Sequence, residues 1–321
     1  MSILIYAEYA EGKFKKVAFE LASYAKKVAE TLGTTVTAVT VNAGDVSELA
    51  KYGVDKVLKV NNDKLSGFTA KAYADVIKQA AVKENVKLVL LSSTTDSVYL
   101  SSLVAVGLEA GYASNVVGLP ISTTPFLVKR NAFSNKAFNT TEIETEIKVL
   151  GLAKNSYGIF ETPSTLTEED FNPTVGENDF GVKVESVEKG SGKVSIADAD
   201  IVVSAGRGLK GPENWKMVED LASVLGAATA CSKPVSDLGW RPHGEHVGQT
   251  GKPVATNLYI AIGISGAIQH IAGVNSSKVK VVINSDPEAP FFKVADYGIV
   301  GDAFEIIPQL IEKFKAFKAQ N

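Results

Sequence analysis

The sequence predicts an α/β protein of two domains, each built on a mostly parallel β-sheet covered by helices. The chain has 321 residues, which is enough for two domains of ordinary size. Hydrophobic residues make up 45% and charged residues 21%, the balance of a folded globular protein. In both halves, short apolar runs alternate with amphipathic helical stretches, and this order is typical of parallel strands joined by helices.

The N-terminal half begins with this strand–helix–strand order. Runs rich in Val, Ile, Leu and Tyr are expected to be strands at residues 3–9, 35–41, 56–60 and 87–93. Between the first two runs, apolar residues recur at spacings of three and four, which predicts an amphipathic helix that ends at Gly33. Its apolar positions are Val17, Leu21, Tyr24, Val28 and Leu32. Farther along, residues 141–152 alternate apolar and polar side chains in places, which indicates a strand with one face in water.

The boundary between the two domains is expected near residue 190. An acidic, turn-rich stretch leads into "EKGSGKVSIADAD" at residues 188–200, a run of Gly, Ser, Lys and Asp that is typical of a linker. We therefore predict an N-terminal α/β domain over residues 1–188, a linker over 189–199 and a second α/β domain over 200–321.

The second half restarts the alternation. Strands are expected at residues 201–206, 228–231, 257–263 and 278–284. Residues 211–226 predict a helix with Pro212 in its first turn. Its buried stripe would be Trp215, Val218, Leu221, Ala222 and Leu225. A closing helix is expected from about residue 302, with Pro308 bending it.

Composition excludes several classes of protein. The net charge of −3 offers no basic face for nucleic acid, and Cys231 is the only cysteine, so neither a disulfide framework nor a cysteine metal cluster is expected. No apolar run approaches the roughly 18–20 residues of a membrane span. The opening "MSILIYAEYA" is typical of a strand rather than a secretory signal. These features predict a cytoplasmic protein that does not insert into membranes.

A glycine-rich loop lies between the first strand and the first helix of the second half. Gly206, Gly208 and Gly211 have the spacing G-x-G-x-x-G, with which a Rossmann-like domain lets its backbone approach a pyrophosphate. An NAD site also needs an acidic residue about 20 positions later, and the next strand ends in Cys231, Ser232 and Lys233 instead. NADP, with its extra phosphate on Lys233, stays open. So does a plain glycine turn with Arg207 on the surface.

Polar corners follow two further segments of the second half. In "HVGQTGK", Gln249 and Thr250 stand between glycines and offer donors and acceptors, although a plain polar turn is an alternative. In "GISGAIQH", Ser265 is expected to cap a helix whose first N–H groups would face a phosphate. His270 on that helix either reaches a flat polar ligand or is a half-buried histidine bonded to backbone.

Other candidate positions carry weaker signals. Asn284 ends a strand, where ligand contacts are common, and Asp302 begins the last helix, either as a ligand contact or as its N-cap. His243 and His246 have a spacing that metal ligands use, but no cysteine or acidic cluster accompanies them, so no metal site is expected. Residues 92–100 predict either a phosphate-binding helix start or, more simply, a capped helix with a Ser or Asx turn.

These motifs occur in the order "SAGRG", "CSKPVSD", "VGQTGK", "LYIAIGISGAIQH" and "INSDPEAPFFKVADYGIVGD". The series closely resembles the C-terminal, flavin-binding domain of electron transfer flavoprotein alpha subunits and covers residues 200–321. Over residues 1–185 the resemblance is looser. It rests there on the strand–helix order and on "KRNAFSNKAF", in which Ser134 stands where that family usually has Gly.

The resemblance implies an electron carrier without substrate chemistry or catalytic residues of its own. It implies a nucleotide-binding-like N-terminal α/β domain, a Rossmann-like domain that holds FAD, and a heterodimer with a beta subunit that carries AMP. Its electrons would come from acyl-CoA or other flavin dehydrogenases and pass to a quinone oxidoreductase. The matching FAD contacts are Arg207, Ser232, Lys233, Val247, Gly248, Gln249, Thr250, Ser265, Gly266, Ala267, Ile268, Gln269, His270, Asn284, Asp302 and Ala303.

The resemblance also implies roles for three of these residues. Thr250 would bond flavin N5, and His270 would lie near the N1–C2 carbonyl edge. Lys233 stands where the family commonly has an arginine, so the charge is kept while the planar fork is lost. A cation or an oriented donor near N1 stabilises negative charge on a reduced flavin, and His270 and Lys233 are the candidates. The alternatives are an NAD(P)-dependent oxidoreductase that uses the 206–211 loop and a nucleotide-sensing or scaffold subunit.

Overall fold

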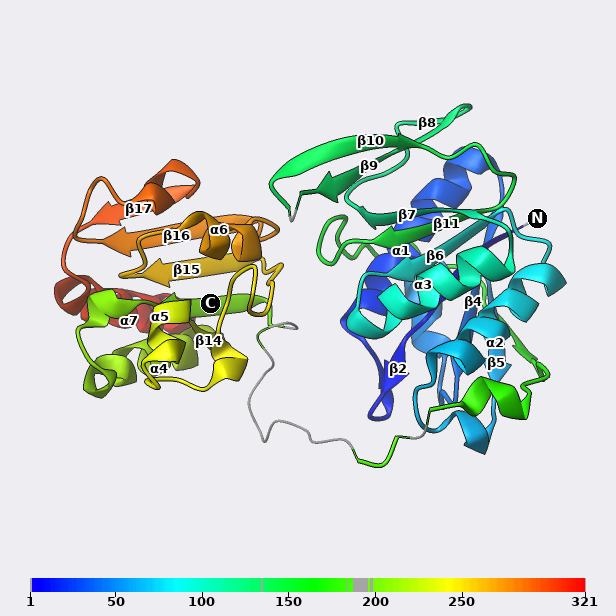
Figure 1. Ribbon diagram of the computed structural model, residues 1–321, viewed down its shortest axis with the longest axis horizontal. Helices are drawn as coiled ribbons and strands as arrows, with labels where there is room; N and C mark the ends of the chain where they lie inside the picture. Colours follow the sequence, from blue (N-terminus) through cyan, green and yellow to red (C-terminus); the bar gives the residue numbers. More distant parts are fainter. Residues whose placement is uncertain (1, 134, 183, 187–195, 197–198, 321) are drawn as a thin grey trace. The chain divides into compact units, whose positions relative to one another are not determined.

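The computed structural model describes residues 2–133, 135–182, 184–186, 196 and 199–320, in two compact units (Figure 1). The first comprises residues 1–132 and 137–187, and the second comprises 133–136 and 188–321. The expected linker, residues 189–199, lies outside the described residues except for Ile196 and Ala199, so its bounds stay a prediction. Among the described residues, no helix has the length and apolar character that a membrane crossing requires.

The first unit is built on a ten-stranded sheet with the order β10-β9-β7-β11-β6-β1-β4-β5-β12, in which β8 pairs with β9. All neighbouring strands from β7 to β12 in this order are parallel to one another. β9 runs antiparallel to both of its neighbours, β7 and β10. The strands are β1 (Ser2–Tyr6), β4 (Thr35–Val41), β5 (Lys56–Val60), β6 (Leu88–Ser92), β7 (Gly111–Val116), β8 (Ser122–Thr123), β9 (Phe126–Ala132), β10 (Ala137–Glu142), β11 (Lys148–Leu152) and β12 (Thr167–Asp170), beside a small hairpin of β2 (Tyr9–Ala10) and β3 (Lys13–Phe14).

Helices cover both faces of this sheet. Ile3 and Ile5 of β1 pack with α1 (Lys16–Leu32) on one face. Leu4 and Tyr6 pack on the other face, with α2 (Ala70–Lys83) and α3 (Thr95–Gly107). Because both faces are covered, the central strands are continuous apolar runs rather than alternating ones. Short 3₁₀ helices complete the unit at Ser47–Tyr52, Asp63–Leu65 and Glu177–Phe180.

The structure confirms the predicted helix α1 and corrects one strand. Gly33 ends α1 in the left-handed conformation, with φ 62°, and the middle of the apolar stripe is buried, although Leu32 at its end is 43% exposed. The prediction of a single strand with one face in water over residues 141–152 is wrong. That stretch holds the end of β10, a bend, and then β11, an inner strand between β6 and β7 whose side chains are buried because helices cover both faces of the sheet.

The second unit is a five-stranded, fully parallel sheet with the order β14-β13-β15-β16-β17. The chain passes from β13 to one neighbour, β14, and then crosses to the other, β15, so the connections reverse direction between β13 and β15. In open α/β sheets this reversal leaves a crevice at the carboxyl ends of the strands, where ligands bind. The strands are β13 (Ile201–Ala205), β14 (Ala228–Cys231), β15 (Leu258–Ile262), β16 (Val279–Asn284) and β17 (Tyr297–Val300).

Helices again cover both faces. The predicted helix over 211–226 is a 3₁₀ turn, Pro212–Trp215, that continues into α4 (Lys216–Leu225). Four members of its predicted stripe are buried, namely Trp215, Val218, Leu221 and Ala222, and the fifth, Leu225, is half-buried. α4, α5 (Lys233–Asp237) and α7 (Ala303–Gln320) share one core, and α6 (Ile268–Val274) packs on the opposite face. Pro308 lies inside α7, which runs through it without a break.

Candidate functional site

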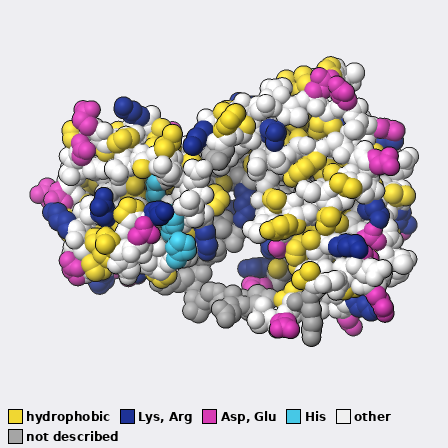
Figure 2. All heavy atoms as spheres, viewed as in Figure 1, with side chains coloured by type: hydrophobic (Ala, Val, Ile, Leu, Met, Phe, Trp, Pro, Cys, Tyr) yellow, Lys and Arg dark blue, Asp and Glu magenta, His cyan; other side chains and the backbone are white. Residues whose placement is uncertain are grey.

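The predicted site residues lie on loops that leave the carboxyl ends of the parallel strands in the second unit. Since all five strands run in the same direction, these loops emerge at one edge of the sheet. Figure 2 shows histidine side chains (cyan) beside lysine or arginine side chains on the face of this unit that is turned to the viewer. The positions are Arg207 after β13, Ser232 and Lys233 after β14, Ser265 to His270 after β15, Asn284 at the end of β16, and Asp302 after β17.

The glycine loop after β13 packs directly against the loop after β15. The Gly206 N–H donates to the Ile262 carbonyl at 2.9 Å, and the Gly208 N–H donates to the Gly263 carbonyl at 3.2 Å. A Cβ on Gly206 would lie 2.3 Å from the Gly263 oxygen, so contact between the loops accounts for that glycine. Arg207 is exposed, and the α-helix begins only at Lys216. A 3₁₀ turn, Pro212–Trp215, follows the loop directly and continues into that helix, so the missing acidic residue after β14, rather than the helix start, counts against the NAD(P) alternative.

The "VGQTG" and "GAIQH" segments are joined by backbone contacts. The Gln249 N–H donates to the Gln269 carbonyl at 2.8 Å, and a Cβ on Gly273 would lie 2.6 Å from the Gly248 Cα. The Val247 N–H donates to the Cys231 carbonyl at 3.0 Å, which ties the same segment to the end of β14. The structure thus brings together three motifs that are far apart in the sequence.

The predicted capping role of Ser265 is wrong. α6 begins at Ile268, and its N-cap is Ala267, without a side-chain capping bond. The chain turns earlier, at Gly266, whose φ is 86° and where a Cβ would lie 2.6 Å from the Phe291 nitrogen. The Phe291 N–H donates to the Ser265 carbonyl at 3.0 Å, so the Ser265 side chain stays exposed beside the start of α6.

His270 is buried, and its ring makes a hydrogen bond to a side chain. Its side chain is 7% exposed, and its Nε2 lies 2.9 Å from the Tyr259 hydroxyl. The pKa of His270 is lowered to about 4, mainly by burial and also by the nearby His246, whereas the Val247 backbone acts in the opposite direction. His270 is therefore neutral near pH 7, which removes it as a cation and leaves the role of oriented donor.

Two ring nitrogens at this site are buried without a hydrogen-bond partner among the described residues. They are Nδ1 of His246 and Nδ1 of His270. Burial, followed by the charge of His243, also lowers the pKa of His246. A buried polar atom without a partner costs about 1–3 kcal/mol, so such atoms commonly mark a place where a ligand or water bonds. A flat heterocycle with carbonyl and ring-nitrogen acceptors matches donors of this kind.

The other candidates differ in what they can offer a ligand. The exposed side chains are Arg207, Lys233, Gln249, Thr250, Ser265, Ala267, Ile268, Gln269 and Asp302, whereas Ser232, Val247, Gly248, Gly266 and Ala303 are buried and Asn284 is half-buried. The Asn284 amide donates to the Ile264 carbonyl at 3.1 Å and therefore holds the loop after β15. Among the described residues, no group of three His, Cys, Asp or Glu side chains has the arrangement of a metal site.

Two further residues, Tyr259 and Lys210, had no separate signal in the sequence. Tyr259 lies in the apolar run of β15, where nothing distinguishes it from a core tyrosine, yet it bonds His270. The Lys210 ammonium lies 4.0 Å from the Asp302 carboxylate and 4.9 Å from the centre of the Phe304 ring. Asp302 also accepts a hydrogen bond from the Phe304 N–H at 2.9 Å, so the N-cap interpretation is right.

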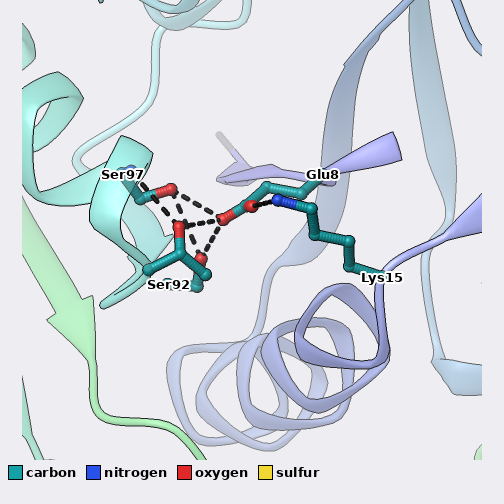
Figure 3. A network of polar contacts seen from close by, with 5 residues as sticks. Glu8, Lys15, Ser92 and Ser97 are labelled. Carbon is teal, nitrogen blue, oxygen red and sulfur yellow. Dashed lines mark hydrogen bonds and ion pairs between the residues drawn. The ribbon is translucent and has the colours of Figure 1, made fainter. Parts of the chain in front are cut away.

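In the first unit, the hydroxyl groups at the start of the helix near residues 92–100 are hydrogen-bonded to the carboxylate of Glu8 (Figure 3). Glu8 Oε1 accepts hydrogen bonds from Thr94 Oγ1 at 2.6 Å, from Ser97 Oγ at 2.8 Å and from Ser92 Oγ. Its Oε2 lies 2.9 Å from the Lys15 ammonium. Thr94 caps α3 by accepting from the Ser97 N–H, so the capped-helix interpretation of this stretch is confirmed.

Comparison with known proteins identifies the family. A model described as the electron transfer flavoprotein domain matches residues 3–172, and one described as the electron transfer flavoprotein FAD-binding domain matches residues 195–275. This chain belongs to the electron transfer flavoprotein family. Electron transfer flavoprotein alpha subunits from Syntrophomonas wolfei, Thermoanaerobacterium thermosaccharolyticum and Bacillus subtilis are 38%, 36% and 35% identical to it, and each alignment covers 97–98% of both chains.

Family membership decides between the functions that the sequence left open. The protein is an electron carrier with an FAD-binding domain rather than a substrate-converting enzyme, and an alpha subunit implies a beta-subunit partner. The two unpartnered imidazole nitrogens and the exposed cations Arg207 and Lys233 fit an anionic cofactor that carries a flat heterocycle. The resemblance stated from the motifs is confirmed, and so is FAD as the cofactor.

Proposed function

We propose that the loops at the carboxyl edge of the second sheet hold FAD, and that the chain receives electrons from acyl-CoA or other flavin dehydrogenases and passes them to a quinone oxidoreductase. The observation that carries the proposal is the pair of buried, unpartnered imidazole nitrogens on His246 and His270 at this edge. They lie where backbone bonds join the predicted contact segments.

Each group of residues has a distinct task in this proposal. Arg207 and Lys233 supply positive charge at the loops after β13 and β14, where it lowers the free energy of the cofactor's negative groups. Gln249 and Thr250 supply exposed polar side chains on a loop whose backbone is held by Gln269. His270 supplies a neutral hydrogen-bond donor in a site with little water. FAD itself supplies reversible acceptance of electrons, and the protein tunes its potential.

The remaining predicted contacts act mainly through backbone and shape. Val247, Gly248, Gly266 and Ala303 are buried, so they offer amides or close packing rather than side-chain chemistry. Ser232 is buried at the end of β14, with its N–H on the Ala205 carbonyl, and places Lys233 at the first position of α5. Asn284 holds the loop after β15 through the Ile264 carbonyl, and Asp302 caps the start of α7.

The experiment is to purify the chain with its beta subunit and to measure the visible spectrum, the flavin content and the AMP content per heterodimer. One FAD per heterodimer, together with AMP that stays with the isolated beta subunit, is the expected result. Arg207→Gln combined with Lys233→Gln should weaken FAD binding more than an exchange of the exposed Lys27 and Lys71, which belong to the first unit, for glutamine. A colourless complex that does not take up added FAD would contradict the proposal.

The donor, the acceptor and the location are tested separately. Reduction of the bound flavin should follow addition of a substrate-reduced acyl-CoA dehydrogenase, and reoxidation should follow addition of a quinone oxidoreductase. Cell fractionation tests the predicted cytoplasmic location. Failure of every dehydrogenase to reduce a flavin-loaded heterodimer would reject the donor assignment and leave the cofactor assignment intact.

A further inference from the structure

Tyr259 and His270 form a buried polar pair in the core of the second unit. Tyr259 lies on the central strand β15 and is 0% exposed, and its hydroxyl lies 2.9 Å from His270 Nε2. Phe291 packs on both partners, with its ring nearly parallel to that of Tyr259 and edge-on to that of His270. The tyrosine ring is thus fixed by the sheet and by Phe291, and its hydroxyl is aimed at one nitrogen of the imidazole.

Burial keeps both partners neutral. It raises the pKa of Tyr259 well above that of a free tyrosine, and it lowers the pKa of His270 to about 4. A neutral imidazole has one N–H donor and one acceptor nitrogen, and the hydrogen bond made by one nitrogen decides which of them carries the proton.

The direction of this hydrogen bond follows from counting donors. The Tyr259 hydroxyl lies 2.9 Å from His270 Nε2. Burial raises the pKa of Tyr259, and a side-chain hydrogen bond from Ser204 lowers it, so Ser204 acts on the hydroxyl oxygen as a donor. If Nε2–H donated to the hydroxyl oxygen, the hydroxyl proton would be buried without an acceptor, at a cost of about 1–3 kcal/mol. If the hydroxyl donates to Nε2, its proton is satisfied, and the imidazole proton resides on Nδ1, which is buried without a hydrogen-bond partner among the described residues.

We propose that Tyr259 is a positioning residue for His270: its hydroxyl donates to Nε2, holds the neutral ring in the Nδ1–H form, and leaves Nδ1 as the ring donor available to the flavin. This inference rests on the proposed placement of FAD beside His270. The opposite tautomer would present a lone pair to an electron-rich acceptor of the flavin, and that contact would become less favourable as the flavin gains negative charge. Tyr259 therefore acts on the cofactor through His270 without touching it.

The first measurement needs no variant. The alpha chain has three histidines, so an alpha subunit labelled with ¹⁵N-histidine, assembled with unlabelled beta subunit and FAD, gives few ring-nitrogen signals. His270→Gln assigns the signals of His270. A protonated Nδ1 and an unprotonated Nε2 are expected near pH 7. An Nε2–H tautomer, or a charged ring, would overturn the proposal.

The second measurement uses Tyr259→Phe, which removes the hydroxyl and keeps the ring that stacks on Phe291. The matched control is Tyr297→Phe on β17, where the side chain is 66% exposed. We expect Tyr259→Phe to populate both tautomers and to lower the first reduction potential by about 59 mV, the equivalent of a tenfold change for one electron. The control should leave the tautomer and the potential unchanged.

A double variant separates a positioning role from a structural one. If Tyr259 acts through His270, then Tyr259→Phe should add little to the shift in potential caused by His270→Gln. Additive shifts, or an unchanged potential in a folded, flavin-loaded Tyr259→Phe variant, would refute the proposal. A wild-type heterodimer that does not bind FAD would instead reject the proposed placement of the cofactor before any variant is made.

Discussion

The Glu8 carboxylate is the most stringent test of how the first unit is held together, and Glu8→Gln is the change that isolates its charge. The variant keeps the size and planarity of the side chain. It removes the ion pair with Lys15 and turns three charge-assisted hydrogen bonds into neutral ones. We expect it to destabilise the first unit while leaving the second unit unchanged.

The magnitude follows from burial and partners. Hydrogen bonds to a charged group contribute about 1.5–3 kcal/mol, and removing one partner of a buried ion pair costs about 3–5 kcal/mol. The cost here is smaller, because the Lys15 side chain is 41% exposed and regains water, and because hydroxyl groups rotate to suit a new partner. We expect a loss of about 2–3 kcal/mol in the free energy of unfolding near pH 7.

The pH dependence has a definite sign. Burial alone would raise the pKa of Glu8, but Lys15 and the hydrogen bonds of Ser92 and Thr94 more than offset it, so the pKa lies below that of a free glutamate. A lowered pKa adds stability that is complete above the unfolded-state pKa, about 4.3, and is lost as the pH falls through the folded-state value. The difference between wild type and Glu8→Gln should therefore be largest near neutral pH and shrink in acid.

The assay can separate the two units. Both tryptophans, Trp215 and Trp240, belong to the second unit, so fluorescence follows that unit. Hydrogen exchange in β1 and α3 follows the first unit. The matched control is Glu30→Gln, which removes an exposed, solvent-screened pair with Lys27 and should leave the free energy of unfolding nearly unchanged. A difference that persists or grows in acid, or an effect of Glu8→Gln equal to that of the control, would refute the reasoning.

Three further predictions concern the second unit. Gly206→Ala places a Cβ 2.3 Å from the Gly263 oxygen, so it should lower the free energy of unfolding of that unit by about 2 kcal/mol or more. An unchanged midpoint in urea unfolding would contradict the packing argument. Asp302→Ala removes the capping bond from the Phe304 N–H and should lower the free energy of unfolding by about 1 kcal/mol, with faster hydrogen exchange at the start of α7. Asp302→Asn, which can still accept this bond, should keep most of the wild-type stability. Lys233→Met should lower the first reduction potential of the flavin and Lys233→Arg should keep it, as measured by spectroelectrochemical titration; equal potentials in all three proteins would reject a role for this charge.

Local periodicity predicted most of the fold, because burial on one or both faces leaves a regular trace in the sequence. The stripe of α1 and its glycine end are examples, as is the helix that begins with Pro212. The failure at residues 141–152 has a physical cause. Alternation there suggested a strand with one face in water, but the pairing of β11 is decided by β6 and β7, whose paired residues lie 36 or more positions away in the sequence.

The site was less predictable than the fold, for the same reason. The motifs located the loops, because the backbone conformation of a turn restricts which residues its own segment can contain, and glycines and polar residues are favoured there. The charge state of His270 depends on Tyr259 and Phe291, which lie on other elements and read as ordinary core residues. The capping role expected for Ser265 failed because Gly266 must turn against Phe291 before the helix begins.

The two units contain the same topological feature and use it in opposite ways. In the first unit, connections reverse between β1 and β6, and there Glu8 satisfies the hydroxyls at the start of α3 and pairs with Lys15. In the second unit, connections reverse between β13 and β15, and two buried imidazole nitrogens beside exposed cations are left without partners among the described residues. A crevice filled by an internal anion has its donors occupied, whereas one with unpaired donors gains free energy when a ligand pairs them. Hydrogen-bond satisfaction at the point of reversal therefore distinguishes the crevice that Glu8 fills from the crevice of the FAD-binding unit, even though both sheets have the same local connectivity.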